Sequence, residues 1–171
     1  YRRQAISHRT NHTVLPKNMR VAHQRVGSIS NAHVGADFER VAAKYFAADG
    51  ISVTQNFCVP VGLHAKKKHA FDLGSASPKI LIECKSHKWT AGGKVPSAKM
   101  TTWNEAMYYF HLAPEGYRKI FFILRHRRNE VGETLLSYYQ RIYSHLIPPD
   151  VEFIVSVIRD TLDCALADAT R

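Results

Sequence analysis

Residues 80–89, ILIECKSHKW, combine an apolar run with two closely spaced charges. Ile80, Leu81 and Ile82 are typical of a strand in the middle of a sheet, whereas Glu83 and Lys85 add an acid and an amine two positions apart. Successive side chains of a strand point to opposite faces, so these two charges share one face and Cys84 points to the other. Burying either charge without a partner costs several kcal/mol. The stretch therefore predicts either a structural ion pair or a site that needs both groups.

The segments on either side of this strand predict an α/β fold. Upstream, residues 70–74 form a short strand that pairs with 79–89 as a hairpin across a Gly/Ser/Pro turn. The remaining expected elements are a helix from 31 to about 49, a strand at 51–60, a loop at 61–69, a helix at 97–113, a strand at 117–128, a helix at 132–147 and a strand at 151–158. This order predicts a mixed central sheet flanked by helices on both faces.

The charge of the chain is strongly basic, with 24 Lys and Arg against 14 Asp and Glu and a formal net charge of +10. A surplus of this size attracts polyanions, so nucleic acid is the first partner to consider. A basic surface that only aids solubility is the alternative. The 171 residues support a single domain. We expect residues 1–28 to form a basic flexible arm or linker and residues 29–171 to form the domain.

The cellular location is predicted from what the sequence lacks. No apolar run approaches the roughly 20 residues of a membrane span, and no signal peptide is apparent. The three cysteines are scattered and form no CxxC pair. We therefore expect a cytoplasmic protein without membrane contact.

Three carboxylates occupy interpretable positions on the expected elements. Glu39 lies on the first helix, Asp72 on the strand before the hairpin turn, and Glu83 on the strand after it, two residues before Lys85. If the two strands are adjacent, Asp72 and Glu83 converge at one end of the sheet. Hard oxygen ligands in this arrangement suit Mg²⁺, with Mn²⁺ as a substitute, and the free carbonyl of Cys84 is a candidate third ligand. Lys85 then orients a water molecule or stabilises negative charge, and the sequence leaves open whether it acts as a base.

The segments GADFERVAAKYFAADG, AFDLG and LIECKSHKW together resemble the PD-(D/E)XK superfamily of nucleases, also called restriction-endonuclease-like. The resemblance implies an αβββαβ core, DNA as substrate, Asp72 and Glu83 as metal ligands, Lys85 as the catalytic lysine and Glu39 as an assisting acid on the helix. The residue before Asp72 is Phe71 rather than proline, a departure that many members share. For Glu39, a solvated helix residue near Arg40 and Lys44 is an equally good interpretation.

The function expected on this basis is a magnesium-dependent DNA endonuclease that leaves 5′-phosphate ends. Within the superfamily, a type II restriction endonuclease or its catalytic domain is the first choice, and a Holliday-junction resolvase or a DNA repair or mobile-element nuclease is the alternative. A non-catalytic DNA-binding module with the same fold is an alternative of another class. Because a small domain must cut two strands of double-stranded DNA, a homodimer is expected.

Basic residues outside this constellation are candidate DNA contacts. They lie in the expected loop at 61–69, after the strand that carries Lys85, and at the expected end of the strand at 117–128, and they are Lys66, Lys67, Lys68, Lys88, Lys94, Lys99, Arg125, Arg127 and Arg128. The lysine run at 66–68 is equally well explained as a solvated loop. The ten histidines show no H-E-x-x-H or HNH-like spacing, and we interpret most of them as surface or core residues.

Overall fold

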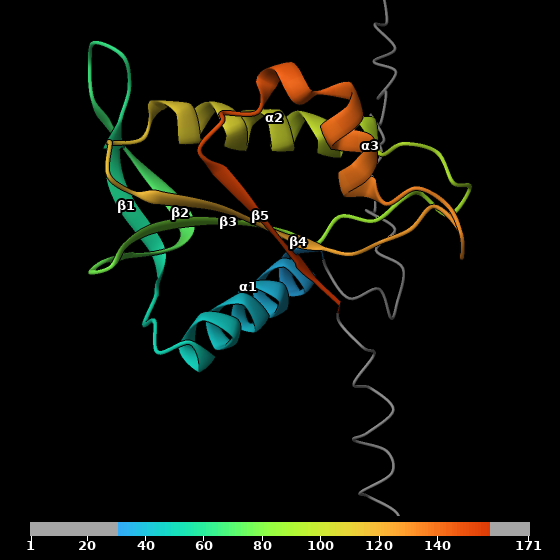
Figure 1. Cartoon of the computed structure of the whole chain (residues 1–171), viewed down its shortest axis with the longest axis horizontal. Helices are drawn as coiled ribbons and strands as arrows, with labels where there is room; N and C mark the ends of the chain where they lie inside the picture. The colour runs from blue at the N-terminus through green and yellow to red at the C-terminus, as the bar shows by residue number, and fades with distance from the viewer. Residues whose placement is uncertain (1–30, 158–171) are drawn as a thin grey trace, which may run out of the picture.

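The computed structural model describes residues 31–157, so the expected arm at 1–28 lies outside the described residues. Within this range the chain forms a five-stranded mixed sheet with helices on both faces (Figure 1). The elements in chain order are α1 (Asn31–Ala48), β1 (Thr54–Val61), β2 (Lys67–Ala76), β3 (Lys79–Lys85), α2 (Ser97–Leu112), β4 (Arg118–Leu124), α3 (Leu135–Ile142), the 3₁₀ helix η1 (Ser144–Leu146) and β5 (Val151–Ser156). The expected α/β class and the order of helices and strands are confirmed.

The strands lie in the order β1-β2-β3-β4-β5. The first three form an antiparallel meander, and β3, β4 and β5 run parallel to one another. Strand β4 is at the centre of the parallel part and is buried on both faces over six of its seven residues. This explains its almost unbroken apolar sequence, because a parallel strand covered on both faces has no solvent side.

Two hydrophobic layers cover the sheet, one on each face. On one face α1 packs Phe38, Ala42 and Phe46 against Leu73, Ile80, Ile82, Ile120 and Phe122. On the other face α2 and α3 pack Trp103, Met107, Phe110, Leu135 and Tyr139 against Phe71, Leu81, Phe121 and Ile123. Figure 1 shows α1 on the opposite side of the sheet from α2 and α3. None of the described helices combines the length and the apolar character that crossing a membrane requires.

Several element boundaries differ from the sequence-based expectation. The prediction of a loop at 61–69 is wrong for its last residues, because β2 begins at Lys67. This strand pairs with β1 through Val61↔Lys67 and Pro60↔Lys68. The strand that carries Glu83 ends at Lys85 rather than at residue 89. Strand β4 ends at Leu124, where its pairing with β5 ends at Ser156, rather than at residue 128. The expected helix at 132–147 is divided into α3, which Thr134 caps, and η1.

Candidate functional site

Asp72 lies where strands β2 and β3 separate. The ladder between the two strands runs as far as Leu73↔Ile82 and stops before Asp72 and Glu83. The amide of Cys84, which has no ladder partner on β2, donates a hydrogen bond of 2.7 Å to Oδ2 of Asp72. The carboxylate thus replaces the missing backbone acceptor, and this contact fixes Asp72 against the end of β3.

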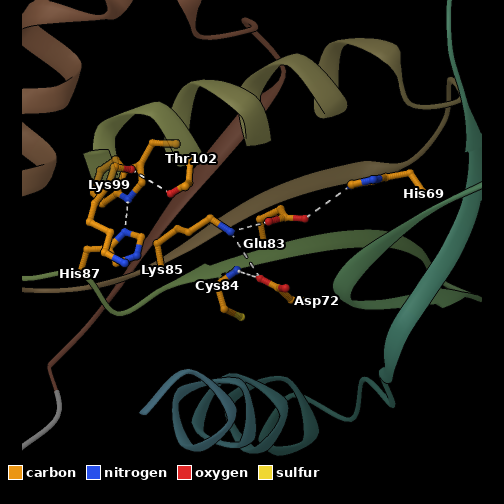
Figure 2. Close-up of polar contacts among 9 residues, drawn as sticks. His69, Asp72, Glu83, Cys84, Lys85, His87, Lys99 and Thr102 are labelled. Carbon is orange, nitrogen blue, oxygen red and sulfur yellow. Dashed lines mark hydrogen bonds and ion pairs between the residues drawn. The ribbon is translucent and has the colours of Figure 1, made fainter. Parts of the chain in front are cut away.

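Lys85 joins the two carboxylates that the sequence predicted to converge. Its Nζ lies 2.5 Å from Oε2 of Glu83 and 3.6 Å from Oδ2 of Asp72. The side chain of Glu83 is 9 % exposed, that of Lys85 14 % and that of Asp72 29 %. Figure 2 shows the Lys85 side chain pointing its amine toward Glu83 and Asp72, with Cys84 beside them. The structure therefore brings Asp72, Glu83 and Lys85 together, and it places the Cys84 side chain against the core under α1 on the other face.

The electrostatics of these three groups are coupled. Burial raises the pKa of Asp72, and the neighbouring Glu83 carboxylate raises it further. Burial also disfavours the ionised form of Glu83, but His69 and Lys85 together hold its pKa below the ordinary value. Burial alone would lower the pKa of Lys85, whereas the attraction of Glu83 and Asp72 raises it. In this arrangement Lys85 carries a positive charge at neutral pH, which favours a role as a charge over a role as a base.

Glu39 faces the same site from α1. It lines a cleft of about 540 Å³ together with Asp72, Cys84 and Lys85. Burial raises its pKa, and Asp72 raises it further, so the two carboxylates feel each other's charge. Glu39 forms no hydrogen bond or ion pair within residues 31–157. The position of Glu39 therefore supports its assignment to the site over the alternative of a solvated helix residue.

The cleft lies between the first turns of α1 and α2, at the end of β3. Lys88 and Lys99 also line it, from the loop after β3 and from α2 respectively. A smaller pocket of about 250 Å³ lies beside it between β2, β3 and α2, and Asp72 and Lys85 line both hollows. Asp72 and Lys85 are therefore accessible from two sides, whereas Glu83 lines only the smaller pocket and Glu39 only the larger cleft.

Two residues near the carboxylates were not predicted from the sequence as part of the site. His69, on β2, places Nε2 3.9 Å from Oε1 of Glu83 and stacks on Tyr109 at a centroid distance of 3.6 Å. His87, after β3, lines the large cleft and accepts a hydrogen bond of 2.8 Å from Nε1 of Trp103. Neither histidine follows a recognised spacing, and the only signal for His87 is its position two residues after Lys85.

Most of the predicted DNA contacts gather at one end of the molecule. The backbone amide of Trp89 donates to Nδ1 of His126, and Arg128 lies over the Trp89 ring at 5.5 Å. These contacts join the loop at 86–96 to the turn at 125–134, and Figure 1 shows the two loops side by side. They bring together five residues that we call the basic platform: Lys88, Lys94, Arg125, Arg127 and Arg128. Among the described residues, no carboxylate forms an ion pair with any of the five.

The lysines at 66–68 belong to the β1–β2 hairpin rather than to a loop that enters the site. Lys67 and Lys68 are exposed positions of β2, and Lys66 donates a hydrogen bond of 2.5 Å to the carbonyl of Gly62. Asp72 lies four residues beyond Lys68, which is about 14 Å along a strand. The proposed contact of these lysines with DNA stays a prediction.

The donor set fits a hard divalent cation. Oδ2 of Asp72 and Oε2 of Glu83 both reach the same ammonium nitrogen, so a single cation can interact with both oxygens. No group of three or more His, Cys, Asp or Glu side chains within residues 31–157 is arranged to hold a metal by itself. Mg²⁺ is the metal that accepts one or two carboxylates and takes its remaining ligands from water and substrate phosphate. The metal stays a prediction that these two oxygens make chemically reasonable.

The chain matches no protein-family model, no curated protein and no solved structure. The resemblance to PD-(D/E)XK nucleases therefore depends on the residues and the geometry described above.

Proposed function

We propose that this protein is a magnesium-dependent DNA endonuclease of the PD-(D/E)XK type, with a type II restriction endonuclease or its catalytic domain as the first choice. The observation that carries the proposal is the convergence of Asp72, Glu83 and Lys85 where β2 and β3 separate. The element order, which begins α1-β1-β2-β3-α2-β4, agrees with the αβββαβ core that this superfamily would have. The basic platform, of which Lys88 lines the cleft, would supply charge for the DNA backbone.

Each residue of the site has a chemical role in this proposal. Asp72 and Glu83 would hold the metal, with the Cys84 carbonyl as a further ligand. Magnesium, when bound, lowers the pKa of a water molecule and neutralises charge on a phosphate. Lys85 would keep its positive charge and stabilise the negative charge that develops on the phosphate oxygens during attack. Glu39, whose pKa is raised by burial and by Asp72, would assist through the metal or by orienting the water.

The proposal is tested by incubating the protein with plasmid and genomic DNA in the presence of Mg²⁺ or a chelator. Lys85→Ala and Asp72→Ala are the inactive variants, and Lys44→Gln on α1 is the matched surface control. We expect discrete fragments that require Mg²⁺, that are absent with both variants and that persist with the control. Cutting only four-way junctions would instead favour the resolvase. Cleavage that both variants retain would contradict the assigned site.

A second candidate is a DNA-binding module that does not cut. It is favoured by one observation: Lys85 already lies within 3.6 Å of both carboxylates, so their charge is partly balanced without a metal. DNA binding with no cleavage of duplexes or junctions in Mg²⁺ or Mn²⁺ would support this candidate. A nuclease of this size that cuts two strands would act as a homodimer, which sedimentation in the presence of duplex DNA would detect.

A further inference from the structure

The large cleft contains a group of hydrogen-bond donors that is separate from the carboxylates and Lys85. His87 lines the cleft from the loop after β3, and Lys99 lines it from the first turn of α2. Figure 2 shows the two residues on the same side of Lys85, away from His69. Neither has a role in the water activation described above.

The hydrogen bond from Trp103 determines which nitrogen of His87 carries the proton. The indole Nε1–H of Trp103 donates to Nδ1 of His87 over 2.8 Å. An indole nitrogen is only a donor, so Nδ1 must be unprotonated and the ring proton must be on Nε2. His87 therefore presents an N–H donor at Nε2, and within the described residues no acceptor is bonded to it.

Trp103 is held in place by its surroundings and can therefore orient the imidazole. Its side chain is fully buried, with its ring edge-to-face against Phe121 at 5.2 Å and Tyr139 at 4.9 Å. Tyr139 in turn donates a hydrogen bond to Asn104 on α2. A change of the His87 tautomer would leave the buried indole N–H without an acceptor, which costs about 1–3 kcal/mol.

Burial, together with the neighbouring ammonium groups, keeps the ring of His87 neutral. Burial lowers the pKa of His87 to about 4, with further contributions from Lys99 on α2 and Lys85 on β3. Glu39 from α1 and Asp72 from β2 line the same cleft, as does Lys88 from the loop of His87 itself. At neutral pH the residue is thus an uncharged donor among ammonium groups, and its protonated Nε2 cannot bind a metal ion.

This combination of donors suits an anion with several oxygens. Lys88 and Lys99 form no ion pair with the carboxylates of residues 31–157, so their positive charge is available. Hydrogen bonds from N–H groups to phosphate oxygens are strengthened by the charge of the acceptor. The cleft of about 540 Å³ has room for more than one phosphate group.

We propose that His87 and Lys99 form a phosphate-binding subsite that holds the nucleic-acid phosphate next to the one that is cut. The identity of the ligand as a nucleic-acid phosphate rests on the proposed function. His87 is a positioning residue here: it donates through Nε2, and Trp103 fixes its orientation.

The test uses the full chain labelled with ¹⁵N at histidine and follows the imidazole nitrogens by NMR, with the His87 signals assigned by their loss in His87→Gln. We expect Nε2 to be protonated and Nδ1 unprotonated from pH 8 to pH 5.5. Inorganic phosphate, and then a duplex oligonucleotide in chelator, should shift the Nε2 signal. A proton on Nδ1, a titration near pH 6.5, or no response to either probe would overturn the inference.

Variants separate the two nitrogens. An asparagine amide can take the place of Nδ1, so His87→Asn keeps an acceptor for Trp103 but loses the donor at Nε2. A glutamine amide can take the place of Nε2, so His87→Gln keeps that donor. We expect duplex binding in chelator to weaken about tenfold in His87→Asn and less in His87→Gln. Lys99→Gln should also weaken binding, and Lys44→Gln on α1 should not. Equal binding by His87→Asn and the unmodified protein would contradict the subsite.

Failure of the proposed subsite is distinguishable from failure of the proposed function, because neither the NMR measurement nor the binding measurement in chelator requires DNA cleavage. A protein whose His87 responds to phosphate but which cuts no DNA would refute the nuclease and leave the subsite in place. A protein that cuts DNA with Mg²⁺ while His87 does not respond would refute the subsite alone.

Discussion

Lys85 is the residue on which the charge balance of the site depends. Asp72 and Glu83 are largely removed from solvent at the same point of the sheet, and only the Lys85 ammonium contacts both. His69 adds a weaker interaction with the far oxygen of Glu83, at 3.9 Å. A buried charge is strongly destabilising once its partner is removed, even where the intact pair adds little to stability. The same lysine is thus needed for folding energetics and, in our proposal, for catalysis.

Lys85→Met should destabilise the protein by about 3 kcal/mol at pH 7, because two carboxylates lose their shared partner. Without Lys85, the pKa of Asp72 in the folded state, which is already raised, rises further, and the pKa of Glu83 rises because it loses one of the two partners that hold it below its ordinary value. The folded variant then binds more protons than the unfolded chain, so its stability increases as the pH falls. In the unmodified protein the lowered pKa of Glu83 has the opposite effect, and stability from that group is lost at acid pH. Urea unfolding should therefore show that the free energy of unfolding of Lys85→Met lies below that of the unmodified protein by less at pH 5 than at pH 7. Adding Glu83→Gln to this variant should reduce the difference at pH 7.

Substitutions of Asp72 should separate its structural role from its chemical role. Asp72→Asn keeps an oxygen that can accept from the Cys84 amide, so its free energy of unfolding should stay within about 1 kcal/mol of the original. Asp72→Ala leaves that amide without its acceptor and should cost about 1–2 kcal/mol. DNA cleavage should be lost in both, since neither retains the carboxylate. Cleavage that survives in Asp72→Asn would show that the charge is not required.

His87 predicts a second loss of stability toward acid pH in the unmodified protein, in the same direction as the loss from Glu83. Its pKa is lowered to about 4 in the folded protein, so between that value and the ordinary 6.5 the unfolded chain binds more protons. Stability contributed by the neutral ring is therefore present above about pH 6.5 and is lost as the pH falls toward 4. Thermal unfolding of His87→Gln should show a smaller loss of stability between pH 7 and pH 5 than the unmodified protein. Equal losses would mean that the ring titrates normally in the folded state.

At the scale of elements, the sequence predicts the order of helices and strands and the convergence of Asp72 with Glu83, because both follow from local periodicity and strand pairing. It does not predict where strands end, because ends depend on partners: β2 begins at Lys67 only because β1 offers Pro60 and Val61 as neighbours. His69 and His87 are missed for a related reason. Their roles come from contacts with Tyr109 and Trp103 on α2, and no spacing in the sequence records those contacts.

The two loops at the end of the sheet depend on Trp89 for their relative position. Its side chain is 5 % exposed, packs edge-to-face on Tyr138 of α3 at 5.5 Å and lies beneath Arg128. Trp89→Ala should cost about 3–5 kcal/mol and weaken DNA binding, because Lys88 and Lys94 are no longer held beside the arginines. Trp89→Phe keeps a ring and should lose much less of both. Binding that is unchanged in a folded Trp89→Ala protein would show that the platform does not act as a unit.

For the whole molecule, the net charge of +10 matters less than where the unpaired charges lie. Several basic groups are neutralised by neighbours, including Arg118 with Glu152, Lys119 with Asp150 and Arg141 with Glu133. The basic platform and Lys99 have no such partners among the described residues, and two of these six residues, Lys88 and Lys99, line the cleft. In our proposal these six groups contact the nucleic-acid backbone near the carboxylates, which would repel DNA until a cation balances them.

The salt dependence of DNA binding measures how many of these charges contact phosphates. Each contact with duplex DNA contributes about −0.9 to the slope of log Kobs against log salt concentration. Replacing Arg125 and Arg127 by glutamine should make the slope less steep by about 1 for each residue, with similar losses across DNA sequences. Arg40→Gln is the matched control, because Arg40 lies on α1, does not line the cleft and is already paired with Asp37. Fluorescence anisotropy in chelator, from 50 to 300 mM salt, gives the slopes. A slope that changes equally in the control and the platform variants would show that binding follows net charge alone, and the platform would then have no special role in holding DNA.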